Sequence, residues 1–151
     1  MSYDTAQPYA ASYVLIKKDG KYAFVLRANT DWMNNFWGLP SGKVEKQESF
    51  TAAAIREAKE EVGVTLEAKD LKPVLLVHRY EPSSNAKDWV DMYFEASSWT
   101  GEPYNAEPHV HSELGWFDPK QLPENTIPSV KFALSQIISG KSYAEYGWGD
   151  S

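Results

Sequence analysis

Three glutamates crowded onto one turn of a predicted helix constrain this chain more than any other feature. Glu57, Glu60 and Glu61 stand at positions i, i+3 and i+4, a spacing that brings all three side chains to one helical face. Like charges at this spacing repel one another and destabilise the helix. A hard divalent cation with oxygen ligands, Mg²⁺ above all, would neutralise them. The spacing therefore predicts a metal site.

The glutamates lie beside the apolar side of the predicted helix, not on its polar back. Ser49 is the predicted N-cap and Gly63 the left-handed C-cap. On a helical wheel of about 100° per residue, the acidic face adjoins an apolar stripe, whereas Arg56 and Lys59 point away from it. The alternative, a salt-bridged surface helix, would place its glutamates among the lysines. The stripe consists of Thr51, Ala54, Ile55, Ala58 and Val62.

The stretch from Gly42 to Val64, GKVEKQESFTAAAIREAKEEVGV, resembles the Nudix box of the MutT-like hydrolases at every fixed position. Ser41 departs from the many relatives that carry glycine there, which leaves the metal-binding positions unchanged. The resemblance implies an α/β/α sandwich, in which a mixed, mostly antiparallel-edged sheet lies between the box helix and a C-terminal helix. The fixed positions are Gly42, Glu48, Arg56, Glu57, Glu60, Glu61 and Gly63.

The resemblance also implies the ligands of a Mg²⁺ ion, for which Mn²⁺ is a possible substitute. Glu57 and Glu61 would hold the ion, Glu60 would complete the set directly or through water, and the Gly42 carbonyl would be a further ligand. Two other box residues, Arg56 and Glu48, would order the glutamates by hydrogen bonding without touching substrate.

A carboxylate beside the ion would accept the proton of the attacking water, and three candidates stay open: Glu60, Glu61 and Glu113. The segment carrying Asn105, Glu107, Pro108, Glu113 and Trp116 is similar to one in MutT-like nucleoside triphosphatases. In several relatives a glutamate at the position of Glu113 faces the metals or activates water; the alternative is a carboxylate at the rim.

His109 and His111 stand two residues apart in an irregular, proline-containing segment and could form a metal pair. With no third histidine or cysteine close in sequence, zinc is not predicted there.

Four residues outside the box are candidates for contact with substrate. Arg27 could clamp a phosphate, or it could pair with a box carboxylate. Trp32 and Phe36 could stack on a base, although loop aromatics also cap cores. His78 follows an apolar strand and is either a substrate contact or a packed residue.

The length of 151 residues suits one domain spanning 1–151, with residues 1–8 and 141–151 as flexible ends. The aromatic tail could dock on the domain or meet a second subunit, so both monomer and homodimer stay open. Periodicity predicts an amphipathic helix at Ser129–Ser139. The predicted strands are Ala10–Lys17, Lys21–Arg27, Val64–Leu66, Asp70–Arg79, Trp89–Ser97 and Leu114–Phe117.

Charge and composition narrow the partners. The net charge of −6 disfavours nucleic acid and anionic membranes. The absence of cysteine excludes disulfides and thiolate metal sites. The first thirty residues show no signal-peptide pattern and no stretch is long enough to span a membrane, so we expect a cytoplasmic protein.

We therefore predict Mg²⁺-dependent hydrolysis of a pyrophosphate bond in a nucleoside diphosphate linked to another group. A nucleoside triphosphate, cleaved to monophosphate and pyrophosphate, is favoured over a nucleotide sugar or a dinucleoside polyphosphate. The alternative from a different class, a nucleotide sensor without activity, is disfavoured by the complete box. Specificity is expected to lie in the loops Asn29–Asn35 and Glu81–Lys87.

Overall fold

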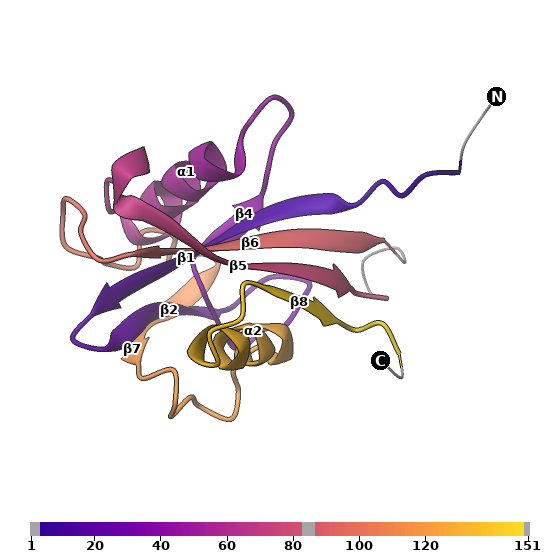
Figure 1. Ribbon diagram of the computed structural model, residues 1–151. Helices are drawn as coiled ribbons and strands as arrows, with labels where there is room; N and C mark the ends of the chain where they lie inside the picture. Colours follow the sequence, from indigo (N-terminus) through magenta and orange to yellow (C-terminus); the bar gives the residue numbers. More distant parts are fainter. Residues whose placement is uncertain (1–3, 83–86, 150–151) are drawn as a thin grey trace.

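The computed structural model describes residues 4–82 and 87–149, so part of the expected specificity loop Glu81–Lys87 lies outside the described residues. One mixed sheet carries a helix on each face (Figure 1). This arrangement confirms the predicted α/β/α sandwich. The elements are β1 (Tyr9–Lys18), β2 (Lys21–Arg27), β3 (Trp37–Gly38), β4 (Ser41–Lys43), α1 (Phe50–Val62), a 3₁₀ turn (Ala68–Asp70), β5 (Leu71–Tyr80), β6 (Asp88–Ala96), β7 (His111–Phe117), α2 (Pro128–Ile138) and β8 (Tyr143–Tyr146).

The main path of the sheet runs β3-β2-β1-β6-β5-β8, with β4 paired to β1 and β7 paired to β2. The pairs β1–β6 and β5–β8 are parallel, and the other ladders are antiparallel. The predicted central strand, β6, lies between β1 and β5. Neither helix in the described ranges is long and apolar enough to cross a membrane.

Strands β1 and β2 start as a hairpin and then separate. Asp19 and Gly20 form the turn with φ values of 54° and 76°, the left-handed conformation that a tight hairpin requires. Pairing extends only over Lys17–Tyr22 and Lys18–Lys21. Beyond that point β1 takes β4 and β6 as neighbours, whereas β2 takes β3 and β7. The separation opens a space between the two groups of strands, at the level where the box loop begins.

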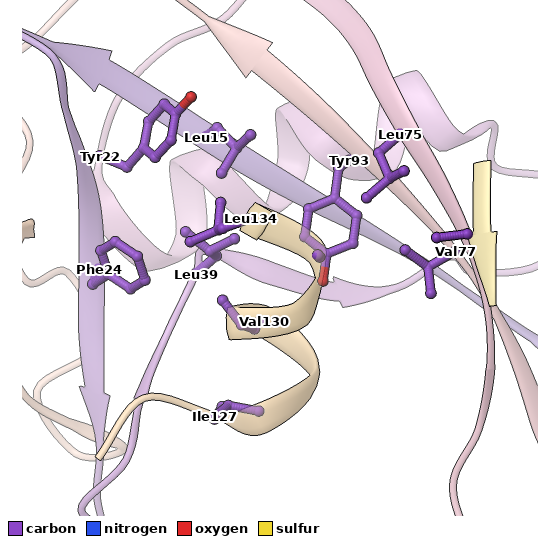
Figure 2. Packing of buried hydrophobic residues seen from close by; sticks show 12 residues of the cluster. Leu15, Tyr22, Phe24, Leu39, Leu75, Val77, Tyr93, Ile127, Val130 and Leu134 are labelled. Atoms are coloured by element: carbon purple, nitrogen blue, oxygen red, sulfur yellow. The ribbon is translucent and has the colours of Figure 1, made fainter. Parts of the chain in front are cut away.

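Two apolar clusters fill the space between the sheet and the helices. On the α2 face, Val130 and Leu134 of the helix pack with Phe24 and Tyr93 of the sheet, as Figure 2 shows. On the α1 face, the buried positions of the predicted helical stripe pack against Val14, Ile16, Ala23 and Val25; these helix residues are Ala54, Ala58 and Val62. The periodicity therefore predicted the buried side of both helices.

Two of the predicted strands differ in the structure. Val64–Leu66 is not a strand: only Thr65 forms an isolated bridge, to Thr100, while Val64 and Leu66 are buried under α1. Strand β7 begins at His111 and not at Leu114, because its partner β2 extends the ladder through a bulge opposite Leu26 and Arg27.

The tail also differs from the flexible end expected. Tyr143–Tyr146 forms β8, which pairs in parallel with β5, and Ala144 is buried in the α2 cluster. Beyond the strand, Trp148 Nε1 donates to the backbone oxygen of His78 at 2.9 Å, and the two rings are in contact. The described part of the tail therefore docks on its own domain.

Truncation of a buried α2 side chain tests the packing. Leu134 is 1% exposed and Ile138 is 47% exposed on the same helix. We expect Leu134→Ala to lower the free energy of unfolding by about 2–5 kcal/mol, since it removes buried methyl groups and leaves a cavity. Ile138→Ala, the matched control, should change it by less than about 1 kcal/mol. Urea unfolding followed by tryptophan fluorescence measures both; equal losses would contradict the packing described.

Candidate active site

Helix α1 has both of its predicted caps, which fix the frame of the site. The Ser49 hydroxyl accepts from Ala52 N at 3.0 Å, and Gly63 ends the helix in the left-handed conformation, with φ of 73°. The ring of Tyr104 occupies the space where a Gly63 side chain would project. The helix therefore begins and ends at the residues that the sequence indicated.

Arg56 ties the helix to the loop that precedes it. Its guanidinium donates to both oxygens of Glu48 (2.8 and 2.9 Å), to the backbone oxygen of Lys43 (3.0 Å) and to Glu57 Oε1 (2.7 Å). These bonds, with a further one from Glu45 N, hold the pKa of Glu48 at about 2. Arg56 and Glu48 thus have the contacts that a positioning role requires.

Glu57 and Glu61 are buried against each other and against the strand β4. Glu61, 6% exposed, accepts from Ser41 N through Oε2 at 2.7 Å. The Glu57 carboxylate fills the space where a side chain at Gly42 would project. Burial raises the pKa of Glu57, and burial together with the charge of Glu57 raises that of Glu61 well above its ordinary value. Without a cation, the two carboxyl groups are held together by a shared proton.

Glu60 differs from its two neighbours because its side chain is half exposed. Its nearest ion-pair contact is Arg56, with Nη1 and Oε2 3.4 Å apart. The structure thus brings Glu57, Glu61 and the Gly42 backbone together and leaves Glu60 at the rim. This set of hard oxygen donors fits Mg²⁺.

A loop missed as a contributor in the sequence analysis approaches Glu61 from the other side. Ligand atoms of Glu61, Glu107 and His111 all lie within 4.8 Å of one another. The loop is held there because Tyr104 N and Ala106 N donate to the carbonyls of Val62 and Glu61, at 3.1 Å each, at the end of α1. The only sequence signal was the segment's likeness to MutT-like triphosphatases around Glu107.

His111 is buried in this group while His109, its suggested partner, is exposed. His111 Nε2 lies 3.5 Å from Glu61 Oε1, and Nδ1 has no hydrogen-bond partner among the described residues. Burial, with the charges of Arg27 and His109, lowers the pKa of His111 to about 4. The ring is therefore neutral at pH 7. The two histidines do not form the metal pair considered from the sequence.

A cleft of about 440 Å³ opens beside the box loop, where β1 and β2 have separated. Three cationic side chains and two indoles line it, which suits an anionic ligand with an aromatic part. A smaller cavity of about 40 Å³ shares four lining residues with it and reaches Glu61 and His111. The cationic and indole residues of the cleft are Arg27, Lys43, Arg79, Trp32 and Trp89.

Two of the four predicted substrate contacts line this cleft. Arg27 pairs with no box carboxylate among the described residues: it donates to Trp32 O at 2.9 Å and Thr30 Oγ1 at 3.2 Å, and lies over the Trp32 ring. The other two lie elsewhere. Phe36 packs against the α2 cluster, and His78 contacts Asp88 (2.6 Å) and Trp148.

Glu113 lies apart from the box glutamates. It is exposed on β7 opposite Leu26. Alternation along the strand turns Leu114 towards the α1 cluster and Phe117 towards the α2 cluster, so Glu113 shares the face of Phe117. The box helix is on the opposite face.

The cleft also contains a buried ion pair that the sequence analysis did not single out. Arg79 and Asp91, 4% and 1% exposed, are joined by hydrogen bonds of 2.6 and 3.2 Å. The guanidinium lies over the Trp89 ring, 4.7 Å from its centroid. Charged residues within otherwise apolar strands were the available signal, since such charges are buried only when paired.

Replacing Glu61 tests the electrostatics. Its raised pKa means that the folded state binds a proton more tightly than the unfolded state, so this stability is present at low pH and is lost as pH rises above about 4.5. We expect Glu61→Gln to flatten that decline in cation-free thermal melts, by about 2–4 °C per kcal/mol at pH 8. Mg²⁺ should stabilise wild type more than the variant. Glu60→Gln is the control and should follow wild type; identical curves for all three would contradict the buried pair.

Gly42→Ala tests the close approach of Glu57 to the loop. A methyl group there overlaps the Glu57 carboxylate, which is the end of a flexible side chain and can move away. We expect a folded protein by circular dichroism whose affinity for Mg²⁺ falls at least about tenfold, which corresponds to about 1.4 kcal/mol. Calorimetric titration measures this; unchanged affinity would rule out the arrangement of Gly42 and Glu57 as a metal site.

Comparison with known proteins agrees with this geometry. The profile of the NUDIX domain matches residues 6–136. A crystal structure of a MutT NUDIX hydrolase from Burkholderia pseudomallei superposes with a TM-score of 0.77 and 32% identity, covering 86% of this chain and 98% of that one. The solution structure of the Escherichia coli ORF135 protein (TM-score 0.75, 21% identity, 92% and 94% coverage) shares the fold.

Two curated relatives are similar in sequence. The uncharacterized Nudix hydrolase YvcI of Bacillus subtilis is 28% identical over 104 residues, which are 69% of this chain and only 62% of that protein. The RNA pyrophosphohydrolase of Novosphingobium aromaticivorans is 27% identical over 142 residues, covering 83% and 86% of the two chains. With the box glutamates gathered around Gly42 and the domain profile matched over most of its length, this chain belongs to the Nudix hydrolases, enzymes that act on phosphorus-containing anhydrides.

Proposed function

We propose that the protein hydrolyses a pyrophosphate bond in a nucleoside diphosphate linked to another group, with Mg²⁺ as the cofactor. The observation that carries this proposal is the pair of buried carboxylates, Glu57 and Glu61, packed against the Gly42 loop at the edge of a cleft rich in cations and indoles. A relative named as an RNA pyrophosphohydrolase supports the general reaction.

The residues proposed to hold the ion are Glu57, Glu60, Glu61 and the Gly42 carbonyl, with Mn²⁺ as a possible substitute. When bound, such an ion neutralises phosphate oxygens and lowers the pKa of water. The contribution of Arg56 is positional, since its bonds to Glu48 and Glu57 prevent the two carboxylates from separating. The chain's own task is to keep these oxygens in one place before substrate arrives.

The cleft is proposed to bind the rest of the substrate. Arg27 and Lys43 supply positive charge beside the box loop for phosphate oxygens, and Trp32 and Trp89 offer faces for a base. The fixed position of Arg27, held by Thr30 and Trp32, suits a phosphate clamp because little ordering remains to be done on binding. Phe36 and His78 are not included, because both are engaged outside the cleft.

A carboxylate is still required to accept the proton of the attacking water. Glu60 and Glu61 are retained as candidates because both belong to the box cluster. Glu113, the third candidate from the sequence, lies on the sheet face away from α1, so the proposal gives it no part in proton transfer. Glu107 lies closer to the cluster than Glu113, within the group that contains Glu61 and His111.

We favour a nucleoside triphosphate as substrate, giving monophosphate and pyrophosphate, acted on by a cytoplasmic protein. The support is the likeness of the Glu107 segment to MutT-like triphosphatases and a cleft of about 440 Å³, within the range of ligand pockets. Nucleotide sugars and dinucleoside polyphosphates are the alternatives within the same reaction. A sensor would bind nucleotide without turnover.

A substrate panel with Mg²⁺ tests the proposal, with both products identified by mass. We expect a nucleoside triphosphate to give monophosphate and pyrophosphate, and Glu57→Gln to lower kcat by about 10²–10³-fold, the loss typical of a key electrostatic contact. Glu102→Gln, an exposed position away from the cleft, is the control and should retain wild-type kcat. Nucleotide binding without turnover across the whole panel would refute the proposal.

A further inference from the structure

We infer that Glu107 and His111, together with Glu61, form a second cation position beside the Nudix box, and that it takes a divalent transition-metal ion, such as Mn²⁺, in preference to Mg²⁺. The inference rests on the proposed function only in that Glu61 is shared with the box. The two positions differ in donor chemistry: carboxylates and a backbone carbonyl at the box, and carboxylates with an imidazole here.

The geometry is that of side chains converging from two directions. Glu61 projects from α1, Glu107 from the loop after Tyr104, and His111 from the first position of β7. Their ligand atoms lie within 4.8 Å of one another. Glu61 can serve both positions because its oxygens face different partners: Oε2 accepts from Ser41 N, and Oε1 faces His111.

A second observation separates this group from an ordinary acidic cluster. His111 is 4% exposed, and its Nδ1 atom has no hydrogen-bond partner among the described residues. Its other nitrogen, Nε2, is turned towards Glu61 but stands 3.5 Å away, longer than a good hydrogen bond. A buried polar group that is left without strong partners requires an explanation, and a ligand that binds nitrogen is one.

An ion pair between His111 and Glu61 is the alternative explanation for their approach. It requires a charged imidazole, whereas the buried ring is neutral at pH 7, and Arg27 and His109 oppose its protonation further. A neutral imidazole has a free lone pair and is the commonest metal ligand among side chains. The surroundings of His111 therefore suit a metal better than a salt bridge.

The donor set determines the kind of ion. Mg²⁺ prefers oxygen ligands throughout and keeps much of its water, whereas imidazole suits Mn²⁺, Fe²⁺, Co²⁺ and Zn²⁺ progressively better. Two carboxylates also balance the charge of a divalent ion in a buried place. The loop is already fixed around the position, because Asn105 Nδ2 donates to the backbone oxygen of His111 at 2.7 Å and His111 N donates to Glu107 O at 3.0 Å.

Pulsed EPR of the tag-free protein, loaded with one equivalent of Mn²⁺ and no nucleotide, tests the inference. The chain has three histidines, so imidazole nitrogen coupling to Mn²⁺ can be assigned with three variants. We expect nitrogen coupling in wild type, in His78→Asn and in His109→Asn, and its loss in His111→Gln. Labelling the histidines with ¹⁵N should shift the signal and separate it from backbone amides. Absence of coupling in wild type, or coupling that survives in His111→Gln, would overturn the inference.

Calorimetric titration gives a second readout that does not depend on turnover. Wild type should bind Mn²⁺ at least about tenfold more tightly than Mg²⁺. His111→Gln should reduce this preference to about twofold while retaining its Mg²⁺ affinity, and circular dichroism checks that it folds.

Glu107→Gln serves if His111→Gln does not fold, since it leaves the imidazole in place. We expect it to weaken Mn²⁺ binding about tenfold with the nitrogen coupling preserved. Equal preference for the two ions in wild type would contradict the inference. These outcomes are independent of the substrate panel: loss of the Mn²⁺ preference leaves hydrolysis with Mg²⁺ untouched, and failure of hydrolysis leaves the nitrogen coupling to be seen.

Discussion

Mutual repulsion between Glu57 and Glu61, in a place with little water, is the constraint around which the site is arranged. Each nearby contact limits how far the two carboxylates can move apart: Ser41 N holds Glu61, and Arg56 and the bare backbone of Gly42 confine Glu57. Such an arrangement costs folding free energy unless a cation compensates for it. The protein therefore gives up some stability so that its oxygens are already in position when an ion binds.

The box helix could be predicted in detail because its determinants are local. Its caps at Ser49 and Gly63, its buried stripe and its crowded glutamates depend on spacing within about four turns. The contribution of His111 could not be predicted in this way. It reaches Glu61 only because β7 pairs with β2 through a bulge beside Arg27, and sequence spacing carries no information about that register.

The same distinction between local and distant determinants explains the other differences. Val64 and Leu66 have the alternation of a strand, but the segment forms a single bridge, and their side chains fill the core under α1. The roles proposed for Arg27 and Trp32 depend on how far β1 and β2 separate after their hairpin, which creates the cleft. Local patterns predicted the strands themselves but not the space between them.

The docked tail has a consequence for how the protein behaves in concentrated solution. Without β8, the ten-residue strand β5 would present a long row of unpaired backbone groups at the edge of the sheet. Four residues of β8 cover part of it and end in a glycine-containing segment, where Trp148 closes over His78. Short, interrupted edges are poor templates for another copy's strands. The tail therefore protects the sheet against edge-to-edge aggregation, a role separate from catalysis.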